Sequence, residues 1–415
     1  EKGYYPAGCL EKDSEKDADG NEVTTFKDLN GNILLERRNL GDTYFVYDHL
    51  GQLRFILSPK YQEKGDLASY AYQYEYDRLG NLIRKTFPGA KYIQYWYDKE
   101  GHLAYEQDSQ LREQDSYRFH MYDTKGREVI IGTTDVLCTY VQNVEMLVNY
   151  TSQEAGLFNT GYKCIVPALE DTLNKSESYF DKVYYYDSYN FLSGYYKNDL
   201  DSLCPTSRLN ANGLLAGSIV VASNGNLLFA VNEYDTKGRL ISSSKKGLDG
   251  LISKVTNNYS LTDKLLESNA EIDVKYGDKL KLTQTNSYST RNDLLAGKSI
   301  TLSHGNGTEV STFLKYEYDA TNRLSKIIRP DKVGTVSYSY DVHGWPVNIT
   351  TDSFKETIYY SDGIGTPCYN GDISSMKWSN SNYDRVRGYK FQYDKLNRLV
   401  SGEYGEGESL EEAKG

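Results

Sequence analysis

Proline, methionine and cysteine are scarce in this chain of 415 residues, which contains 8, 3 and 5 of them respectively. Long apolar runs are missing too, since no stretch approaches the roughly 18 residues that a membrane span needs. Basic residues are outnumbered, because 47 Lys and Arg face 58 Asp and Glu and the formal net charge is −11. Nucleic-acid binding requires a basic stripe, and here Lys and Arg are scattered. We therefore expect no membrane span and no nucleic-acid partner.

Cysteine and histidine are too sparse to define a metal or redox site. The five cysteines are interpreted as isolated thiols or, alternatively, as including one disulfide inside the 138–204 region; they are Cys9, Cys138, Cys164, Cys204 and Cys368. None of the five histidines has a partner at metal-ligand spacing. The stretch 17–22 faintly resembles a calcium loop, but no glutamate follows at the required distance, which favours an acidic turn over a weak cation site. No cofactor and no metal ligand is predicted.

What the chain has in abundance is a short repeat, Tyr-Asp-x-x-Gly-x-Leu, with asparagine in the place of glycine in some copies. Looser copies begin at Phe26, Tyr259 and Tyr288. Spacing of roughly 20 to 30 residues is typical of an array built from one supersecondary unit. The repeat positions are Tyr47, Asp48 and Gly51; Tyr76, Asp77 and Gly80; Tyr97, Asp98 and Gly101; Tyr122, Asp123 and Gly126; Tyr186, Asp187 and Asn190; Tyr234, Asp235 and Gly238; Tyr318, Asp319 and Asn322; Tyr340, Asp341 and Gly344; Tyr393, Asp394 and Asn397.

Each copy of the repeat predicts a β-hairpin. The tyrosine ends a strand with period-2 side chains, and the aspartate begins a type I turn in which its carboxylate accepts a backbone N–H two residues on. Glycine or asparagine follows three residues later, where a three-residue loop with a bulge requires positive φ. The apolar residue six after the tyrosine starts the return strand. These residues are therefore interpreted as turn scaffold rather than as ligands.

Tyrosine supplies 40 of the 415 residues, and aromatic side chains suit a pleated surface better than a run of helices. A buried tyrosine ring also needs a partner for its hydroxyl, which favours a sheet with one wet side over a dry sandwich. The fold class predicted is all-β: tandem β-hairpins that form a curved, spiralling β-sheet shell with little or no helix.

The spacing of the repeats divides the chain into regions. Closely spaced repeats occupy 1–135, longer insertions interrupt the array over 136–233, and repeats return over 234–404 with an irregular segment at 361–390. We expect a disordered tail at 405–415. Because residue 1 is not methionine and no signal-peptide pattern is present, we also expect this chain to be a piece of a longer protein.

The repeats resemble those of the Rhs/YD-repeat family, which is named for its Tyr-Asp pair. Two longer segments are similar to the large Bacteroides-type members: Lys85–Gln107, and the run Tyr369–Ser374 with Trp378 and Arg387–Tyr389. The resemblance covers nearly the whole chain. It implies a strip of hairpins that spirals into a hollow shell, secreted or at the cell surface, which encloses a C-terminal toxin or other polymorphic effector domain for interbacterial competition.

Self-cleaving family members carry an Asp-Pro-x-Gly type motif after the repeats, and this chain has none. No catalytic residue is therefore carried over, and we expect a non-enzymatic scaffold whose partner, its own C-terminal effector domain, is absent from this fragment. The alternative is a surface recognition or adhesion module that binds glycans or a surface protein, a role similar to that of the distantly related teneurins. Aromatic faces can stack on sugars. Alternatively, they can pair across neighbouring strands, and each such pair stabilises a hairpin by roughly 0.2–1 kcal/mol. The residues to test for glycan stacking are Trp96, Trp345 and Trp378.

Overall fold

The structure, a computed structural model, describes residues 6, 8–16, 22–151, 156–205, 211–274, 279–305, 308–329, 334–381, 385–394 and 397–411. Residues 17–21, most of the stretch considered as a cation loop, lie outside this set. The chain divides into two compact units. The first unit comprises Glu1–Tyr72, Asn286–Ser299 and Thr312–Gly415, and the second comprises Gln73–Thr285 and Ile300–Ser311.

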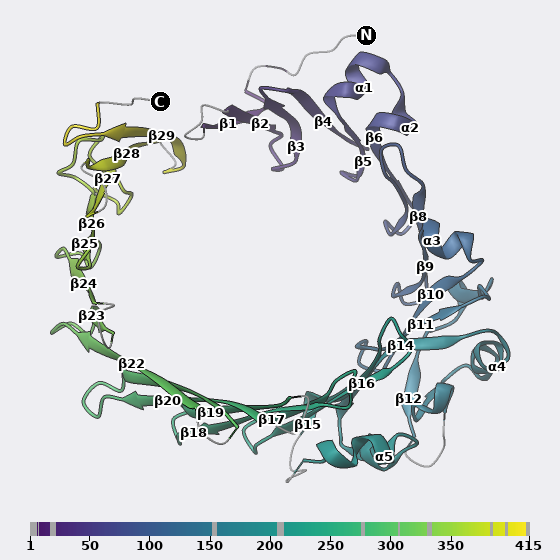
Figure 1. The fold of residues 1–415 in the computed structure, drawn as a ribbon. Coiled ribbons are helices and arrows are strands. Elements are labelled where there is room, and N and C mark those ends of the chain that lie inside the picture. The colour runs from purple at the N-terminus through teal and green to yellow at the C-terminus, as the bar shows by residue number, and fades with distance from the viewer. Residues whose placement is uncertain are drawn as a thin grey trace. The chain divides into compact units, whose positions relative to one another are not determined.

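The first unit contains two runs of antiparallel strands, β1 to β5 and β23 to β29, each strand paired with its neighbours in sequence. Two short helices, α1 (Pro59–Lys64) and α2 (Leu67–Tyr70), follow the first run (Figure 1). The strands are β1 (Glu11–Lys16), β2 (Glu22–Lys27), β3 (Ile33–Arg38), β4 (Gly41–Tyr47), β5 (Leu53–Leu57), β23 (Leu324–Ile328), β24 (Thr335–Tyr340), β25 (Pro346–Thr350), β26 (Phe354–Tyr359), β27 (Ser375–Asn380), β28 (Arg387–Tyr393) and β29 (Leu399–Glu406).

The second unit continues the same pattern from β7 to β19, with successive antiparallel ladders. Its main strands are β7 (Leu82–Thr86), β8 (Tyr92–Tyr97), β9 (Leu103–Gln107), β10 (Tyr117–Tyr122), β11 (Glu128–Thr134), β14 (Tyr179–Asp187), β15 (Ala211–Val221), β16 (Leu227–Tyr234), β17 (Leu240–Lys246), β18 (Ile252–Tyr259) and β19 (Leu265–Asp273). Four strands have residues in both units: β6 (Ala71–Tyr76), β20 (Lys279–Tyr288), β21 (Leu295–His304) and β22 (Thr308–Tyr318).

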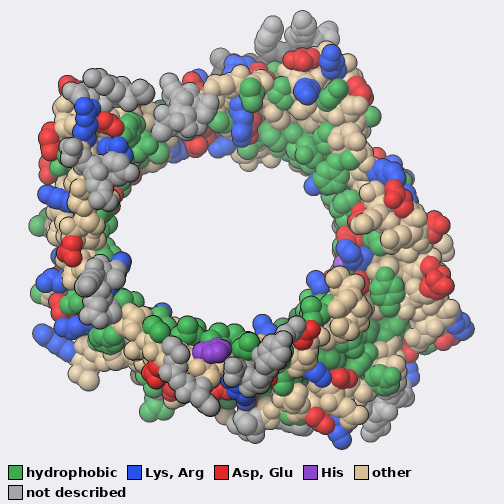
Figure 2. Space-filling view, in the orientation of Figure 1, with side chains coloured by type: hydrophobic (Ala, Val, Ile, Leu, Met, Phe, Trp, Pro, Cys, Tyr) green, Lys and Arg blue, Asp and Glu red, His purple; other side chains and the backbone are tan. Residues whose placement is uncertain are grey.

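The predicted all-β fold of tandem hairpins is confirmed. Helices are few and short among the described residues, and the longest, α4 (Pro167–Lys175), has 9 residues. The strands are thinly covered on much of their length, and apolar side chains remain visible on the surface (Figure 2). Tyr44 and Val46 on β4, for example, are each 38% exposed.

The region 136–233, where the repeat spacing opens, carries most of the helical structure. Between β11 and β14 lie η1 (Val141–Asn143), β12 (Val148–Tyr150), η2 (Leu157–Asn159), β13 (Tyr162–Cys164) and α4. Between β14 and β15 lie η3 (Asn190–Ser193), α5 (Lys197–Leu200) and η4 (Asp201–Leu203). A further short helix, α3 (Ser109–Glu113), joins β9 to β10.

These inserted segments cover one face of strands β9 to β11 and β14 to β16, and α4, α5 and β12 lie on one side of that sheet (Figure 1). The result is a hydrophobic core in which Phe119, Met121 and Ile130 from the strands meet Leu157 and Leu173 from the insertions. Cys138 and Cys164 are buried free thiols in the same core, so a disulfide between these two is absent. The inserted segments therefore supply the second layer that a fully buried hydrophobic core requires.

The C-terminal stretch differs from the disordered tail expected at 405–415. Strand β29 continues to Glu406, the Gly407 N–H donates to the Val386 carbonyl oxygen (2.8 Å), and the Leu410 side chain is buried. Burial of the apolar Leu410 side chain removes it from water and thereby stabilises this ordered conformation. Residues 412–415 lie outside the described set.

Candidate functional site: the joint between successive repeats

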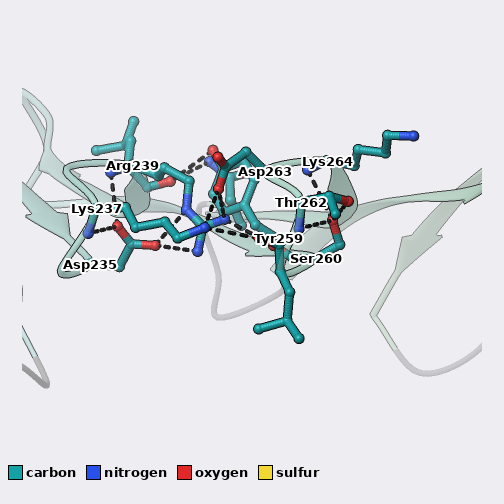
Figure 3. Close-up of polar contacts among 11 residues, drawn as sticks. Asp235, Lys237, Arg239, Tyr259, Ser260, Thr262, Asp263 and Lys264 are labelled. Atoms are coloured by element: carbon teal, nitrogen blue, oxygen red, sulfur yellow. Dashed lines mark hydrogen bonds and ion pairs between the residues drawn. The ribbon is translucent and has the colours of Figure 1, made fainter. Parts of the chain in front are cut away.

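The turn after Tyr234 shows how one repeat is built (Figure 3). The Asp235 carboxylate accepts hydrogen bonds from the backbone N–H groups of Lys237 (2.8 Å) and Arg239 (2.9 Å). The Gly238 N–H donates to the Asp235 carbonyl oxygen (3.0 Å), and Gly238 has φ +79°. The strand register shifts just before Tyr234. This is a three-residue hairpin loop with a bulge, in which only a residue that tolerates positive φ fits the fourth position.

Most of the other predicted turns have the same geometry. The aspartates whose Oδ1 accepts N–H groups from the residues two and four positions later are Asp28, Asp48, Asp77, Asp98, Asp123, Asp319 and Asp341. Asp394 accepts from the Arg398 N–H (3.0 Å). The residues at the positive-φ position are Gly51, Gly80, Gly101, Gly126, Asn322, Gly344 and Asn397.

One predicted turn does not form. The chain leaves the sheet after Asp187, which has φ +69°, and Asn190 begins the 3-10 helix η3 instead of closing a hairpin. Phe191 and Leu192 enter the hydrophobic core of the insertion, and this burial outweighs the local turn preference. The Tyr186-Asp187-Asn190 turn assignment is therefore corrected.

The loose repeat at Tyr259 uses a substitute for the aspartate. The Ser260 hydroxyl oxygen accepts from the Thr262 (3.2 Å) and Lys264 (3.1 Å) N–H groups, and Asp263 takes the positive-φ position with φ +65°. A serine side chain can form the same kind of turn more weakly than aspartate. Because the Ser260 side chain closes this turn, the Asp263 carboxylate can form a contact with another repeat.

The tyrosine hydroxyl of one repeat is bonded to the backbone of the repeat before it. Tyr97 donates to the Leu82 carbonyl oxygen (2.9 Å), at the start of the preceding return strand. The same contact recurs in Tyr122 to Leu103, Tyr234 to Leu215, Tyr259 to Leu240, Tyr318 to Leu295, Tyr340 to Leu324, Tyr360 to Pro346 and Tyr393 to Ile373, with distances of 2.8–3.1 Å. The partner that a half-buried tyrosine hydroxyl needs is thus supplied by the neighbouring hairpin.

The side chain four positions after the turn aspartate of one repeat packs against the tyrosine ring of the next repeat. Arg239 lies over Tyr259 at 5.0 Å, and its guanidinium also pairs with Asp263 (2.6 Å) and with its own Asp235 (Figure 3). Equivalent ring contacts are Arg127 over Tyr186 (4.3 Å), Arg323 over Tyr340 (4.8 Å), His102 on Tyr122 (4.6 Å) and Trp345 against Tyr360 (4.9 Å). We call this set of contacts between successive repeats the joint.

The joint adds a residue that the sequence reasoning missed, the arginine at the fourth position after the aspartate. A signal for it was present, because arginine directly follows the turn glycine or asparagine at Arg127, Arg239, Arg323 and Arg398. Its second function, reaching into the next repeat, depends on how hairpins stack side by side. No reading of one repeat alone reveals that contact.

Hydrogen bonds within the turns and across the joints favour the ionised form of several carboxylates. Bonds from the backbone N–H groups of Gln52 and Arg323 hold the pKa values of Asp48 and Asp319, respectively, below the usual aspartate value. The Arg127 side chain does the same for the pKa of Asp187. In the opposite direction, burial raises the pKa of Tyr97, Tyr234 and Tyr318. Charged acceptors and neutral donors are the forms that the joint stabilises.

The three tryptophans do not come together at one site. Trp345 is stacked on His343 (4.6 Å) within its joint, and Trp378 lies among Tyr389 (5.8 Å) and Tyr404 (6.5 Å). Trp96 packs edge-on against Tyr117 (5.6 Å) and borders a cavity of about 370 Å³. That cavity is also lined by Tyr95, Asn81, Gln142 and Asn143. Trp96 thus lies beside a cavity with several amide side chains.

Within the described ranges, no group of three or more His, Cys, Asp or Glu side chains has the arrangement of a metal site. Asp98 differs from the other turn aspartates because its side chain is fully buried. Its Oδ2 accepts from the Met146 N–H (3.0 Å) of the insertion and lies 3.2 Å from His102 Nδ1. This turn therefore anchors the insertion to the array. None of the described helices has both the length and the apolar character needed to cross a membrane.

Comparison with known proteins yields distant structural likeness. No family model matches the chain, and no curated protein matches it. The crystal structures of TcdB2-TccC3-Cdc42 and TcdB2-TccC3-TEV are similar to 92% and 91% of this chain at 13% identity and a TM-score of 0.31, and the matched part is 20% of their chains. A porin-like protein from Bacteroides uniformis is similar over 64% of this chain and 89% of its own, at 9% identity and a TM-score of 0.23. This chain spans about a fifth of the length of the first two.

Proposed function

We propose that this chain is a non-enzymatic structural scaffold, a wall segment of an Rhs/YD-repeat shell that encloses a C-terminal effector domain for interbacterial competition. The observation that carries the proposal is the recurrence of one joint from repeat to repeat. An array whose units bond to their neighbours through equivalent contacts can extend by repetition into a continuous wall. The residues that distinguish the repeat form contacts that hold neighbouring hairpins together.

The state of the repeat aspartates supports a structural role. A general acid must hold a proton near working pH, and a general base needs a free lone pair directed at its substrate. Asp319 has a lowered pKa, and its carboxylate oxygens accept from backbone N–H groups and from Arg323 Nε (2.7 Å). Carboxylates of this kind serve as fixed acceptors in the scaffold.

The proposal implies a longer natural protein that is secreted or displayed at the cell surface, with the effector domain following these repeats. The test uses this longer natural protein in its full length. Limited proteolysis followed by mass spectrometry should leave the segment after the repeats intact until the repeats are unfolded, whereas the same segment expressed alone should be digested quickly. Equal digestion in both contexts would contradict enclosure, and a membrane or wall anchor in place of an effector domain would favour a surface role.

The cavity beside Trp96 favours one alternative, a recognition module that binds glycans. An aromatic face next to planar amides such as Asn81, Gln142 and Asn143 is suited to a sugar, which has an apolar face and a ring of hydroxyls. Saturable binding on a glycan array that is lost in Trp96→Ala would support this alternative. The matched control is Trp378→Ala, because Trp378 packs among tyrosines. Binding that both variants lose, or that neither loses, would exclude this cavity as the site.

A further inference from the structure

The arginine of the repeat at Tyr393 has an unusual partner. In the internal joints Arg239 and Arg323 reach the turn of the next repeat along the chain, and Arg127 reaches Asp187 at the end of β14. Arg398 keeps the bond to its own Asp394 (2.7 Å), but its Nη1 pairs with Glu11 (2.5 Å) and Asp13 (2.8 Å) on strand β1. Residues near the two ends of the chain are thus joined by the contact that elsewhere joins successive repeats.

Strand β1 is suited to that position by its charge. Its sequence Glu-Lys-Asp-Ser-Glu-Lys alternates, so Glu11 and Asp13 point to one side of the strand. Asp13 is held from the other direction by Lys27 of β2 (2.8 Å), which places its carboxylate between two cations. Strands β1 and β29 lie against each other in the first unit. The contact therefore combines neighbouring strands with a network of three charged pairs.

We propose that β1 covers the free edge of β29: Glu11 and Asp13 bind Arg398 as Asp263 of the next repeat binds Arg239, and so protect that edge. The ladder described for β29 is with β28, which leaves its other edge as the side that β1 approaches. An open strand edge is a template for pairing with another chain, and charged side chains are a common means of blocking it. The occupant is this chain's own acidic N-terminal strand. This inference holds whatever the array encloses.

The contact should depend on salt. The side chains of Arg398 and Glu11 are 39% and 44% exposed, so their attraction is screened as ionic strength rises. Hydrogen–deuterium exchange of the β1 amides in the unmodified protein should accelerate severalfold between low and high salt. The amides of β24, in the middle of a run of ladders, should change much less.

The decisive variant is Arg398→Glu, which turns the attraction to Glu11 and Asp13 into repulsion. We expect faster exchange in both β1 and β29 and assemblies whose mass by light scattering rises with protein concentration, where the unmodified chain stays monomeric. The matched control is Arg323→Glu, which makes the same change beside Asp319 in an internal joint. It should leave β1 exchange and the monomeric mass unchanged.

Two further variants guard against a folding defect in Arg398→Glu. Glu11→Gln with Asp13→Asn removes the charges from the β1 side and should give the same two effects more weakly. Glu11→Arg combined with Arg398→Glu should restore part of the slow exchange, which a mere loss of turn structure could not do. Unchanged β1 exchange in Arg398→Glu, or assembly of the unmodified chain at the same concentrations as the variant, would overturn the proposal.

Discussion

The sheet from β9 to β16 and the hairpins from β23 to β25 are built from the same repeat but are stabilised differently. In the first region the insertion buries one face, and Phe119, Met121 and Ile130 are fully buried. In the second, Val336 is the large apolar residue that reaches a buried state, and its neighbours stay half-exposed. One region depends on a hydrophobic core, and the other depends on joints. Removing a core residue and removing a joint contact should therefore have different effects in the two places.

The two turns at Asp98 and Asp341 make the same comparison at atomic scale. Both carboxylates form the same pair of backbone bonds. The second oxygen of Asp98 is buried and binds the insertion, whereas that of Asp341 lies near the largely exposed His343 (3.3 Å). A repeat can thus form an uncovered part of the sheet or anchor an inserted segment, depending on what packs against it.

The largest expected effect is in the core. Phe119→Ala should lower the free energy of unfolding of the second unit by about 3–5 kcal/mol, because it removes a fully buried ring and leaves a cavity. Ile327→Ala, in the half-exposed strand β23, should cost clearly less. Urea unfolding of both variants measures the difference. Equal losses would mean that the hairpins of β23 to β25 have a core as deep as the insertion region.

Next in size is the backbone of the turn. Gly238→Val should destabilise by about 1–3 kcal/mol, because φ is +79° there and a β-branched residue is strained in that region. The added Cβ would meet its nearest atom, Leu214 Cδ1, at an ordinary 3.5 Å, so the cost is one of conformation. Gly80→Val, at φ +91°, should behave alike.

The control at this position is Gly238→Asn. Asparagine already occupies the same place at Asn322 and Asn397, with φ +66° and +61°. Thermal melting should therefore show a small loss for asparagine and a large one for valine. Unchanged melting of the valine variant would contradict the turn geometry.

A single joint bond should be worth less than a strained turn. Tyr340→Phe removes the hydroxyl that donates to the Leu324 carbonyl oxygen (2.8 Å) and should cost about 1 kcal/mol. Tyr195→Phe, at a tyrosine that is 68% exposed, is the control and should leave the melting temperature unchanged. Similar melting of the two variants would show that the joint hydroxyl contributes no net stability.

The smallest effect per group is that of pH. Asp48 and Asp319 have pKa values lowered from 3.8 in the folded chain, so folding favours their charged form. Their contribution to stability is complete above about pH 4 and is lost as the pH falls through the folded-state values. Melting temperatures measured from pH 7 down to pH 3 should decline at the acid end. The decline should be shallower in Asp319→Asn, and an identical slope would contradict the linkage.

The sequence predicted well what depends on a few adjacent residues. Asp235 and Gly238 could be assigned to a bulged hairpin loop because aspartate bonding and positive φ are local properties of the chain. The prediction failed at Asn190, where the local pattern was present but Phe191 and Leu192 were drawn into a core. It also missed the role of Arg239, whose partners Tyr259 and Asp263 belong to another hairpin.

Adjacent residues were enough to predict the repeating hairpin, which is closed by aspartate and by glycine or asparagine and is rich in tyrosine. Packing settled three further features: how the hairpins are joined, where an insertion creates a core, and how Glu11 and Asp13 meet Arg398 across most of the chain. The physical reason is range. Turn preferences act over about four residues, whereas burial and charge pairing depend on which surfaces packing brings together.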